Sequence, residues 1–563
     1  MADFRSPAAG APAWLRLTGL LILGAAVAGW LALALRVVNP IVVWDEVAYL
    51  VGGVDIEHSA RLYGLAPELP QYGNFLFMRL IQAIDAARLP VEPALKALNT
   101  LCVAMAAGLL GWWTWGRVGR LSWLALFFVA CIYPTASYAA YIMPEAVYAG
   151  LFAMIWCLAT RGAQGLMVRW CVFAAGAGVM TMIKVHALFL FIAWQAATLV
   201  WVVLDREVSW RKGLQLIAAA TAVFALFAWA THGLTAPPLS QPGEVIGHSY
   251  QKALSQSAPT LASLSVAVSL LPGYVAAVLL LFAPTLCFLT VAAFSRGAQP
   301  AGEAAAPDLK RFQAIFLLGL LALILAVTCQ MLSWEPNRIH LRYAGFVFPW
   351  MLGLAAIWNQ ASPQLGGAAY RRVTAVLWLA ATAYFVFRLH DLRPLPVDAP
   401  ELFFAHWNDE FGPLGLGAAA PYVIAGLFGG AAVLMLVTRI NWLPIQLGVL
   451  ILVLPLSIWN LAHAQARLSQ DEVQHVVGEA ARTQCAPGDV LALVTKANGP
   501  WVYRAFYGLR RATQLTVVEP SQLPMAVAAA PAGSCLLTSS PVTGRPATLL
   551  ASQPGVWLYR LAK

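Results

Sequence analysis

The sequence predicts a mainly α-helical, polytopic membrane protein that ends in a small α/β domain. Of its 563 residues, 60% are hydrophobic and only 11% are charged, and the mean hydropathy is +0.72. A water-soluble globule of this size needs far more polar surface. Apolar runs recur as far as about residue 462, whereas the remainder is less apolar and more often broken by Pro and Gly. We therefore expect a transmembrane domain over 1–462 and a separate domain over 463–563.

A transmembrane helix needs about 20 apolar residues, and this criterion predicts about 13 spans. The first apolar run is longer than the core of a secretory signal and lacks a cleavage site of small residues, so we count it as a span. The predicted spans are 14–38, 98–115, 121–140, 146–160, 170–183, 187–204, 214–230, 264–294, 314–332, 343–357, 373–386, 421–437 and 443–461.

The stretch 170–202 decides the topology. As one helix it would be about 50 Å long, against a hydrocarbon core of about 30 Å, so two short helices fit better. This division places the Arg and Lys clusters on one face, as the positive-inside rule requires of the cytoplasmic side. It also explains the net charge of +10 without a nucleic-acid partner. The N-terminus is then cytoplasmic and the C-terminal domain lies outside.

The C-terminal domain is predicted to contain one helix, 471–482, and short strands at 490–495, 501–507, 515–518, 535–538 and 556–561. Two of the eight cysteines, Cys485 and Cys535, fall in this domain, and the others fall within predicted spans. An oxidising compartment would allow a disulfide between them, and the sequence leaves this open. No spacing resembles a zinc site or a Gly-rich phosphate loop, which argues against ATP hydrolysis.

Two adjacent carboxylates, Asp45 and Glu46, follow the first span and open a long outer loop, 39–93. Acidic side chains at a membrane boundary lie where a general base can meet a substrate carried in the bilayer. Solvation of the loop is the alternative, but it gives no reason to place two acids directly at a helix end. Later in the loop, 72–88 has an apolar stripe opposite charged residues, which predicts an amphipathic helix lying flat on the outer leaflet.

A third carboxylate, Glu145, follows Pro144 at the outer end of the fourth span, where it is either a helix cap or a site residue. Lys184 lies between the two short helices at membrane depth. It could snorkel to the interface, but an ammonium facing the same outer cavity would hold a phosphate.

A cationic outer loop completes the set of candidate site residues. Arg338, His340 and Arg342 lie in a predicted outer loop, whereas the positive-inside rule concentrates basic residues in cytoplasmic loops. Arginine binds phosphate oxygens bidentately, so these residues suggest an anionic ligand outside the membrane, with headgroup anchoring as the alternative.

Together these features resemble the GT-C superfamily of polyprenyl-phosphate-dependent membrane glycosyltransferases. The resemblance rests on the acidic pair in the first outer loop, the acidic residue before the fourth span, the lysine in Met182-Ile183-Lys184-Val185-His186, and Arg342-Tyr343 followed by Pro349. It covers about 14–461 and is nearest to the branch of protein O-mannosyltransferases and the lipid A aminoarabinose transferase. The residues around Lys184 depart from the Lys-Pro or Arg-Pro form of such enzymes.

The resemblance implies transfer of a hexosyl or pentosyl group from a polyprenyl phosphate to a hydroxyl of a lipid, glycan or protein on the outer face, with inversion. Asp45 would be the general base, Glu46 would orient it or the acceptor, and Glu145 would complete the catalytic set. Lys184, Arg338, His340 and Arg342 would bind the donor phosphate. Some relatives hold a divalent cation such as Mg²⁺ or Mn²⁺ and others need none; Asp45, Glu46 and Glu145 could converge on one.

Other classes of protein remain open at this stage. A polytopic transporter would be expected to have paired repeats and ionisable residues near the bilayer midplane. A polyprenyl-linked glycan ligase or polymerase would rely on a large outer loop in the second half, and a catalytically dead relative is separable only by assay. The Ala-, Leu- and Arg-rich composition suggests a bacterium of high genomic GC content, and hence an inner membrane with periplasmic chemistry.

Overall fold

The structure is a computed structural model. It describes residues 12–36, 46, 49–50, 53, 74–161, 165–204, 208–236, 261–295, 309–331, 338–389, 391, 393–395, 397–405, 419–468, 477, 480–481, 483–485, 490–495, 513–518, 520–538, 541–542, 546–553 and 556–562. Asp45, the expected strand 501–507 and most of the expected helix 471–482 lie outside the described residues.

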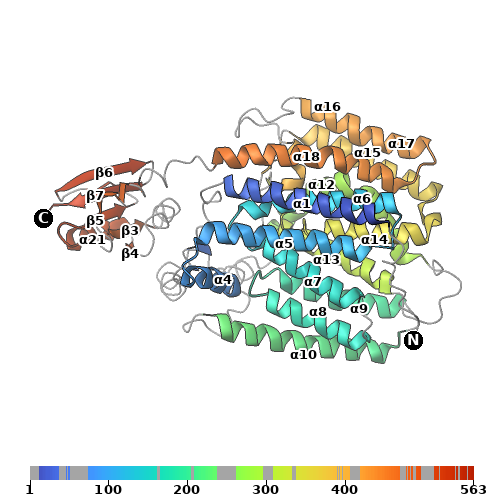
Figure 1. The fold of residues 1–563 in the computed structure, drawn as a ribbon, viewed down its shortest axis with the longest axis horizontal. Helices are drawn as coiled ribbons and strands as arrows, with labels where there is room; N and C mark the ends of the chain where they lie inside the picture. The colour runs from blue at the N-terminus through green and yellow to red at the C-terminus, as the bar shows by residue number, and fades with distance from the viewer. Residues whose placement is uncertain are drawn as a thin grey trace.

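The described helices form one bundle whose members run along the long axis of the molecule, with the C-terminal domain beyond one end (Figure 1). Its members are α1 (Ala13–Arg36), α5 (Val91–Thr114), α6 (Arg120–Cys131), α7 (Glu145–Arg161), α8 (Leu166–Met180), α9 (Ala187–Leu204), α10 (Trp210–Thr235), α12 (Leu261–Phe294), α13 (Leu309–Met331), α14 (Phe348–Ala361), α15 (Ala368–Arg388), α16 (Ala420–Ile424), α17 (Gly430–Val437) and α18 (Trp442–Leu468). The π-helix η8 (Ala425–Gly429) joins α16 to α17.

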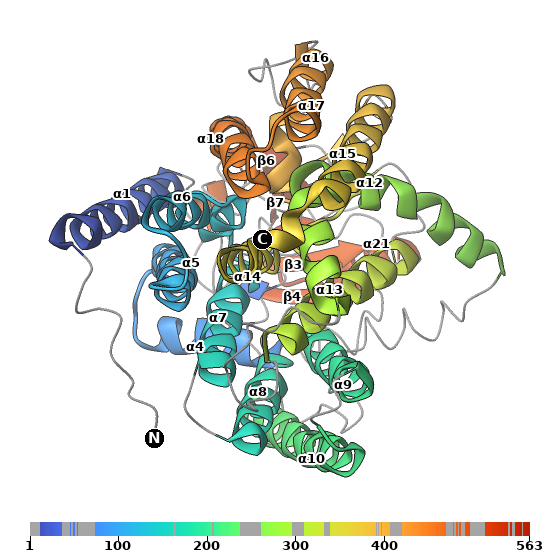
Figure 2. The same ribbon diagram turned by 90° about the vertical axis from the view of Figure 1, so that its right-hand side faces the viewer.

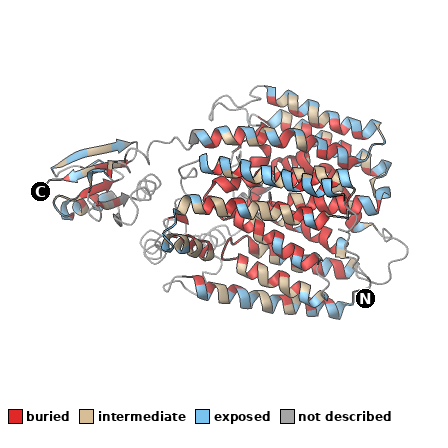
Figure 3. Ribbon diagram, viewed as in Figure 1, coloured by how far each residue is buried: buried red, intermediate tan, exposed pale blue. Residues whose placement is uncertain are grey.

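The predicted spans all overlap described helices. Nine continuous helical stretches among the described residues are long and apolar enough to cross a membrane, and two of them, Arg120–Ala140 and Ala420–Val437, each combine consecutive elements. The predicted division of 170–202 is correct, because α8 ends at Met180 and α9 begins at Ala187. Large apolar side chains such as Trp229 of α10 and Phe387 of α15 are exposed. Figure 3 shows exposed residues along the helices at the periphery of the bundle, where a bilayer would cover them. The chain is therefore a multi-pass membrane protein with the expected mainly α-helical fold.

α14 is the central helix of the bundle. Viewed along the helices, it lies in the middle, between α5 and α6 on one side and α12 and α13 on the other (Figure 2). It is buried on all faces from Trp350 to Asn359. Its start differs from the prediction: the helix expected from 343 begins only at Phe348, after the turn 341–347, with Pro349 in its first turn. This turn becomes part of the candidate site.

Two proline residues change the expected spans. The range 121–140 divides into α6 and a 3₁₀ helix, η2 (Pro134–Ala140), because Pro134 cannot continue the hydrogen-bond ladder of α6. α12 is kinked at Phe282, near Pro284. Pro284 leaves the Leu280 carbonyl without its helical donor, and Trp378 Nε1 of α15 donates to that carbonyl at 2.7 Å.

The expected amphipathic helix is present as α4 (Phe75–Ala86), at the end of the bundle nearest the C-terminal domain (Figure 1). Its start is tied to the turn between α8 and α9: Asn74 Nδ2 donates to the Ile183 carbonyl at 2.6 Å, and Leu76 N donates to the Met182 carbonyl at 3.0 Å. The start of α4 therefore contacts the turn that carries Lys184.

The C-terminal domain contains a five-stranded sheet in the order β4-β3-β5-β7-β6. The strands are β3 (Val490–Thr495), β4 (Thr513–Val518), β5 (Cys535–Thr538), β6 (Ala547–Gln553) and β7 (Val556–Leu561), with a short helix α21 (Leu523–Ala529). β3 pairs in parallel with β4 on one side and with β5 on the other. β7 pairs antiparallel with β5, and β6 pairs antiparallel with β7. β6 and α21 were not predicted. The boundary expected at 462 falls inside α18, which continues to Leu468.

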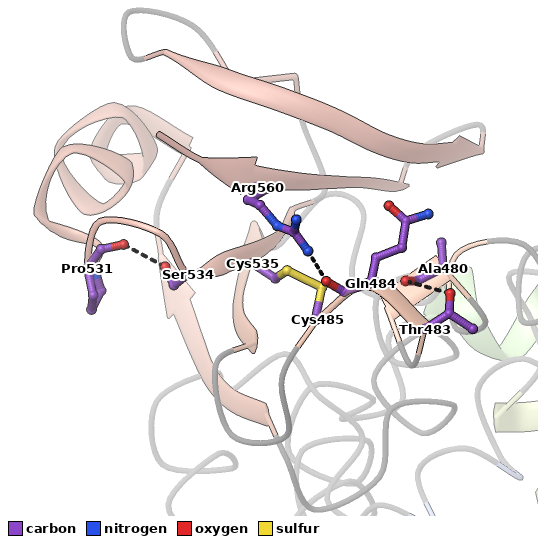
Figure 4. The surroundings of a disulfide bond; sticks show 8 residues. All are labelled: Ala480, Thr483, Gln484, Cys485, Pro531, Ser534, Cys535 and Arg560. Carbon is purple, nitrogen blue, oxygen red and sulfur yellow. Dashed lines mark hydrogen bonds between the residues drawn. A yellow bond between two sulfur atoms is a disulfide. The ribbon is translucent and has the colours of Figure 1, made fainter. Parts of the chain in front are cut away.

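Cys485 and Cys535 form a disulfide bond in this domain, with an S–S distance of 2.08 Å (Figure 4). Cys535 is the first residue of the central strand β5. Cys485 follows a short helical turn, and the Arg560 guanidinium of β7 donates a hydrogen bond to the Gln484 carbonyl in that turn. The bond thus fastens the segment that leads out of α18 to the middle of the sheet.

Candidate active site

A polar pocket brings together residues that are far apart in the sequence. It is lined by Thr135, Tyr138, Glu145, Tyr148, Ala149, Lys184, His186, Arg342, Tyr343 and Phe346, and its open space is about 300 Å³. Three of the predicted site residues, Glu145, Lys184 and Arg342, are therefore in one pocket. They come from the start of α7, the turn between α8 and α9, and the turn before α14.

Lys184 and Glu145 form a buried ion pair in this pocket, with Nζ and Oε1 2.5 Å apart. Each residue is only 7% exposed. Backbone hydrogen bonds from Lys184 N to the Met180 carbonyl and from Ala187 N to the Lys184 carbonyl fix the turn that carries the lysine. Glu145 is the first residue of α7, where the helix dipole favours a carboxylate. Its second oxygen, Oε2, has no hydrogen-bond partner among the described residues.

The Tyr343 ring contacts the three other basic or titratable side chains on the cationic side of the pocket, Lys184, His186 and Arg342. Lys184 Nζ lies 4.9 Å from the centre of its ring, and Arg342 Cζ lies 4.8 Å from it. The His186 ring stacks on Tyr343 with ring centres 4.3 Å apart. Burial, and then the charges of Lys184 and Arg342, hold the pKa of His186 well below its usual value, so this imidazole is neutral at pH 7. The permanent cations of the pocket are therefore Lys184 and Arg342.

The buried carboxylate of Asp398, which was not predicted as a site residue, contacts all three basic side chains of the cationic loop. Its carboxylate oxygens lie 2.6 Å from Arg338 Nη2, 3.1 Å from His340 Nδ1 and 3.8 Å from Arg342 Nη1. Its backbone carbonyl accepts a hydrogen bond from Arg342 N at 2.7 Å. Burial alone would raise the pKa of Asp398, but the hydrogen bond from His340 and the nearby charges outweigh it and lower the pKa to about 2. Arg338 and His340 are therefore directed at Asp398 and do not line the pocket.

The segments on either side of this cluster are joined by a short parallel bridge. β1 (Arg338–Ile339) pairs with β2 (Arg393–Pro394), which brings the chain before Asp398 beside the cationic loop. Nothing in the local sequence signalled Asp398, because an isolated acid in a proline-rich connection usually indicates a solvated loop.

Glu46 lies near the pocket without lining it. Its side chain is fully buried, and its Oε1 accepts a hydrogen bond from Ile142 N at 2.6 Å. Ile142 is three residues before Glu145, so Glu46 holds the link that presents Glu145 to the pocket. Asp45, its neighbour in the sequence, is outside the described residues.

The described residues offer little support for a metal centre. Among them, no group of three or more His, Cys, Asp and Glu side chains is arranged to hold an ion. Glu145 keeps one free oxygen, but Glu46 already uses one oxygen for a backbone N–H and is enclosed. Glu46 and Glu145, the two described members of the predicted metal-binding set, are therefore not arranged by themselves to hold a divalent cation.

An apolar pocket adjoins the polar one. The two share Thr135, Ala149 and Phe346, and the second is otherwise lined by Val103, Ala106, Ala107, Leu110, Ala130, Tyr133, Ala136, Pro349 and Trp350. Its open space is about 430 Å³. Cations at one end and an apolar wall at the other are the features that an anionic headgroup on an apolar chain requires.

Comparison with solved structures identifies the fold. The chain aligns with a crystal structure of ArnT from Cupriavidus metallidurans bound to undecaprenyl phosphate, with a TM-score of 0.55, 12% sequence identity, and coverage of 96% of this chain and 97% of that one. A crystal structure of the same protein in the apo state aligns over the same shares with a TM-score of 0.48 and 12% identity. No family model and no curated protein matches the sequence. The polytopic fold expected from the resemblance to the GT-C superfamily is confirmed over nearly the whole chain.

Proposed function

We propose that the protein is an inverting membrane glycosyltransferase that moves a sugar from a polyprenyl-phosphate donor to a hydroxyl acceptor on the outer face of the membrane. The observation that carries this proposal is the convergence of Glu145, Lys184 and Arg342 on one pocket that continues into an apolar one. The fold likeness to a protein crystallised with undecaprenyl phosphate supports the class of donor.

The donor phosphate would lie against the cations of the polar pocket. Lys184 and Arg342 would neutralise the charge that grows on the phosphate as it departs, which lowers the barrier to transfer. Arg338 and His340 would act through Asp398, which holds the Arg342 backbone and side chain in place. The apolar pocket would receive the first part of the polyprenyl chain.

The transfer would be a direct displacement. The acceptor oxygen attacks the anomeric carbon while Asp45 takes its proton, and the bond from that carbon to the phosphate oxygen breaks with its electron pair leaving on the phosphate. The products are the glycoside and the polyprenyl phosphate. Glu46 would fix the backbone at Ile142, and Glu145 would hold the Lys184 ammonium in the pocket.

The test compares membranes from cells with and without the gene by mass spectrometry of their lipid and glycan fractions. A missing pentose or hexose would name the product. Asp45→Asn should abolish the transfer while the variant protein stays folded. Asp391→Asn, which changes an exposed carboxylate that pairs with Arg388, should retain it. Full activity of Asp45→Asn would remove the proposed mechanism.

A further inference from the structure

The polar and apolar pockets meet at a neck formed by Thr135, Ala149 and Phe346, the three residues that line both pockets. Ala149 is partly exposed, although the residues on either side of it in α7 are buried. Leu158, which is exposed, marks the outer face of α7. Nine residues of an α-helix amount to about 180° of rotation, so Ala149 lies on the opposite face. Its exposure is therefore toward the pockets.

The position of Ala149 is fixed by the packing of α7 on α5, which lie side by side (Figure 2). A Cβ atom added to Gly150 would lie 2.9 Å from the Cys102 carbonyl oxygen and 2.9 Å from Met105 Cε. Only a residue without a side chain allows this approach. α7 is therefore held against α5 at the residue that follows Ala149, so a larger side chain at position 149 extends into the neck.

The other two sides of the neck are also held in place. The Phe346 ring packs edge-on against two rings of α7, with its centre 5.0 Å from that of Tyr148 and 4.9 Å from that of Phe152. Thr135 packs on the turn that carries Phe346, because its Cγ2 would lie 2.6 Å from a Cβ atom added to Gly345. The width of the neck therefore depends on the side chain at position 149, which is a single methyl group.

Small side chains also make the space beyond the neck. The lining of the apolar pocket includes four alanines from α5, α6 and η2, namely Ala106, Ala107, Ala130 and Ala136. On the other side of the neck, the polar pocket is lined by Lys184 and Arg342. A ligand that occupies both pockets must carry an anionic group at the end of an apolar chain, and it must be narrow where the two parts join.

We propose that Ala149 is the specificity-determining residue of the site: its methyl side chain leaves the neck open, and the site thereby selects a phosphate ester of a long apolar alcohol. This inference rests on the proposed function and identifies the residue that selects for the lipid part of the donor. The phosphate contacts Lys184 and Arg342 while the chain passes Ala149 into the apolar pocket. A larger side chain at position 149 closes the neck, so the phosphate of a lipid no longer reaches the two cations. A phosphate without a chain still fits the polar pocket.

The experiment compares the binding of undecaprenyl phosphate and of methyl phosphate to the full-length protein in detergent. The apparent affinity for each is obtained from the rise of the unfolding temperature with ligand concentration. In Ala149→Leu the affinity for undecaprenyl phosphate should fall at least about a hundredfold, because its phosphate loses two charge-assisted contacts that each contribute roughly tenfold or more. The affinity for methyl phosphate should stay close to that of the wild-type protein. Ala149→Val, a smaller change, replaces Ala149→Leu if the latter does not fold.

The controls separate this inference from the function on which it rests. Ala218→Leu makes the same change at an exposed position of α10 and should bind both phosphates as the wild-type protein does. An equal loss of both affinities in Ala149→Leu, or no loss of either, overturns the role of Ala149. So does a failure of methyl phosphate to bind the wild-type protein, because the polar pocket then does not hold a phosphate by itself. Absence of undecaprenyl phosphate binding to the wild-type protein overturns the proposed function and this inference with it.

Discussion

At the scale of single residues, the Lys184–Glu145 pair carries the strongest prediction about the pocket. Both charges are buried and each is compensated by the other. Lys184→Met should lower sugar transfer by at least about a hundredfold, because a preorganised cation at the departing phosphate is lost. It should also cost about 3–5 kcal/mol of stability, because Glu145 is left buried and unpaired. Transfer assays and thermal unfolding in detergent measure the two effects.

The double variant Lys184→Met with Glu145→Leu separates these effects. Removing both charges should recover most of the lost stability, since no unpaired ion remains, but none of the lost transfer. Lys310→Met, an exposed lysine at the start of α13, should behave as wild type. Normal activity of Lys184→Met would contradict a phosphate-binding role.

The site residues that were predicted differ from those that were missed in a physical way. The sequence singled out Lys184 and Arg342, which line the same pocket, because a cation predicted at the outer face or at membrane depth departs from a strong statistical rule. Asp398 breaks no such rule, since acidic residues in connections are usually solvated. Its burial arises only when the turn 341–347 packs on the connection that carries Asp398, a contact between segments more than fifty residues apart.

At the scale of elements, α12 supplies a prediction about the kink. Pro284 frees the Leu280 carbonyl, and Trp378 Nε1 of α15 donates to it. Trp378→Phe should cost about 1–3 kcal/mol of stability, because a buried carbonyl loses its donor. In a Pro284→Ala background the backbone N–H of residue 284 becomes available, so the same substitution should cost less. Thermal unfolding of the four proteins gives the coupling, and equal costs in both backgrounds would contradict this explanation.

The helices themselves were predictable because a span is set by length and hydrophobicity alone, which a sequence displays directly. The end of α9 at Leu204 agrees with the prediction for this reason. The division of α6 from η2 and the late start of α14 were not predicted. Apolar runs continue through both places, and only the backbone geometry at Pro134 and in the turn 341–347 ends the helix.

At the scale of the whole molecule, the site elements lie at one end of the bundle. α4 lies at the end where α18 leads into the C-terminal domain (Figure 1), and its start contacts the turn that carries Lys184. Strand runs of high β-propensity predicted four of the strands in that domain with little error, namely β3, β4, β5 and β7, whereas β6, with Ser and Gln among its residues, lacks such a run. The orientation of this end relative to the cell is a prediction that the disulfide can test.

The disulfide between Cys485 and Cys535 should form in cells only if the C-terminal domain reaches an oxidising compartment. A membrane-impermeant maleimide applied to spheroplasts should therefore label neither cysteine until a reductant is added, and then label both. Closing a loop of 50 residues contributes about 4 kcal/mol in the chain-entropy estimate, so the Cys485→Ser, Cys535→Ser variant should also be cut faster by an added protease. Cys131 and Cys157, buried in α6 and α7, serve as internal controls that stay unlabelled. Labelling of the two domain cysteines only after the membrane is opened, and without reductant, would place this end of the bundle in the cytoplasm and contradict an outward-facing site.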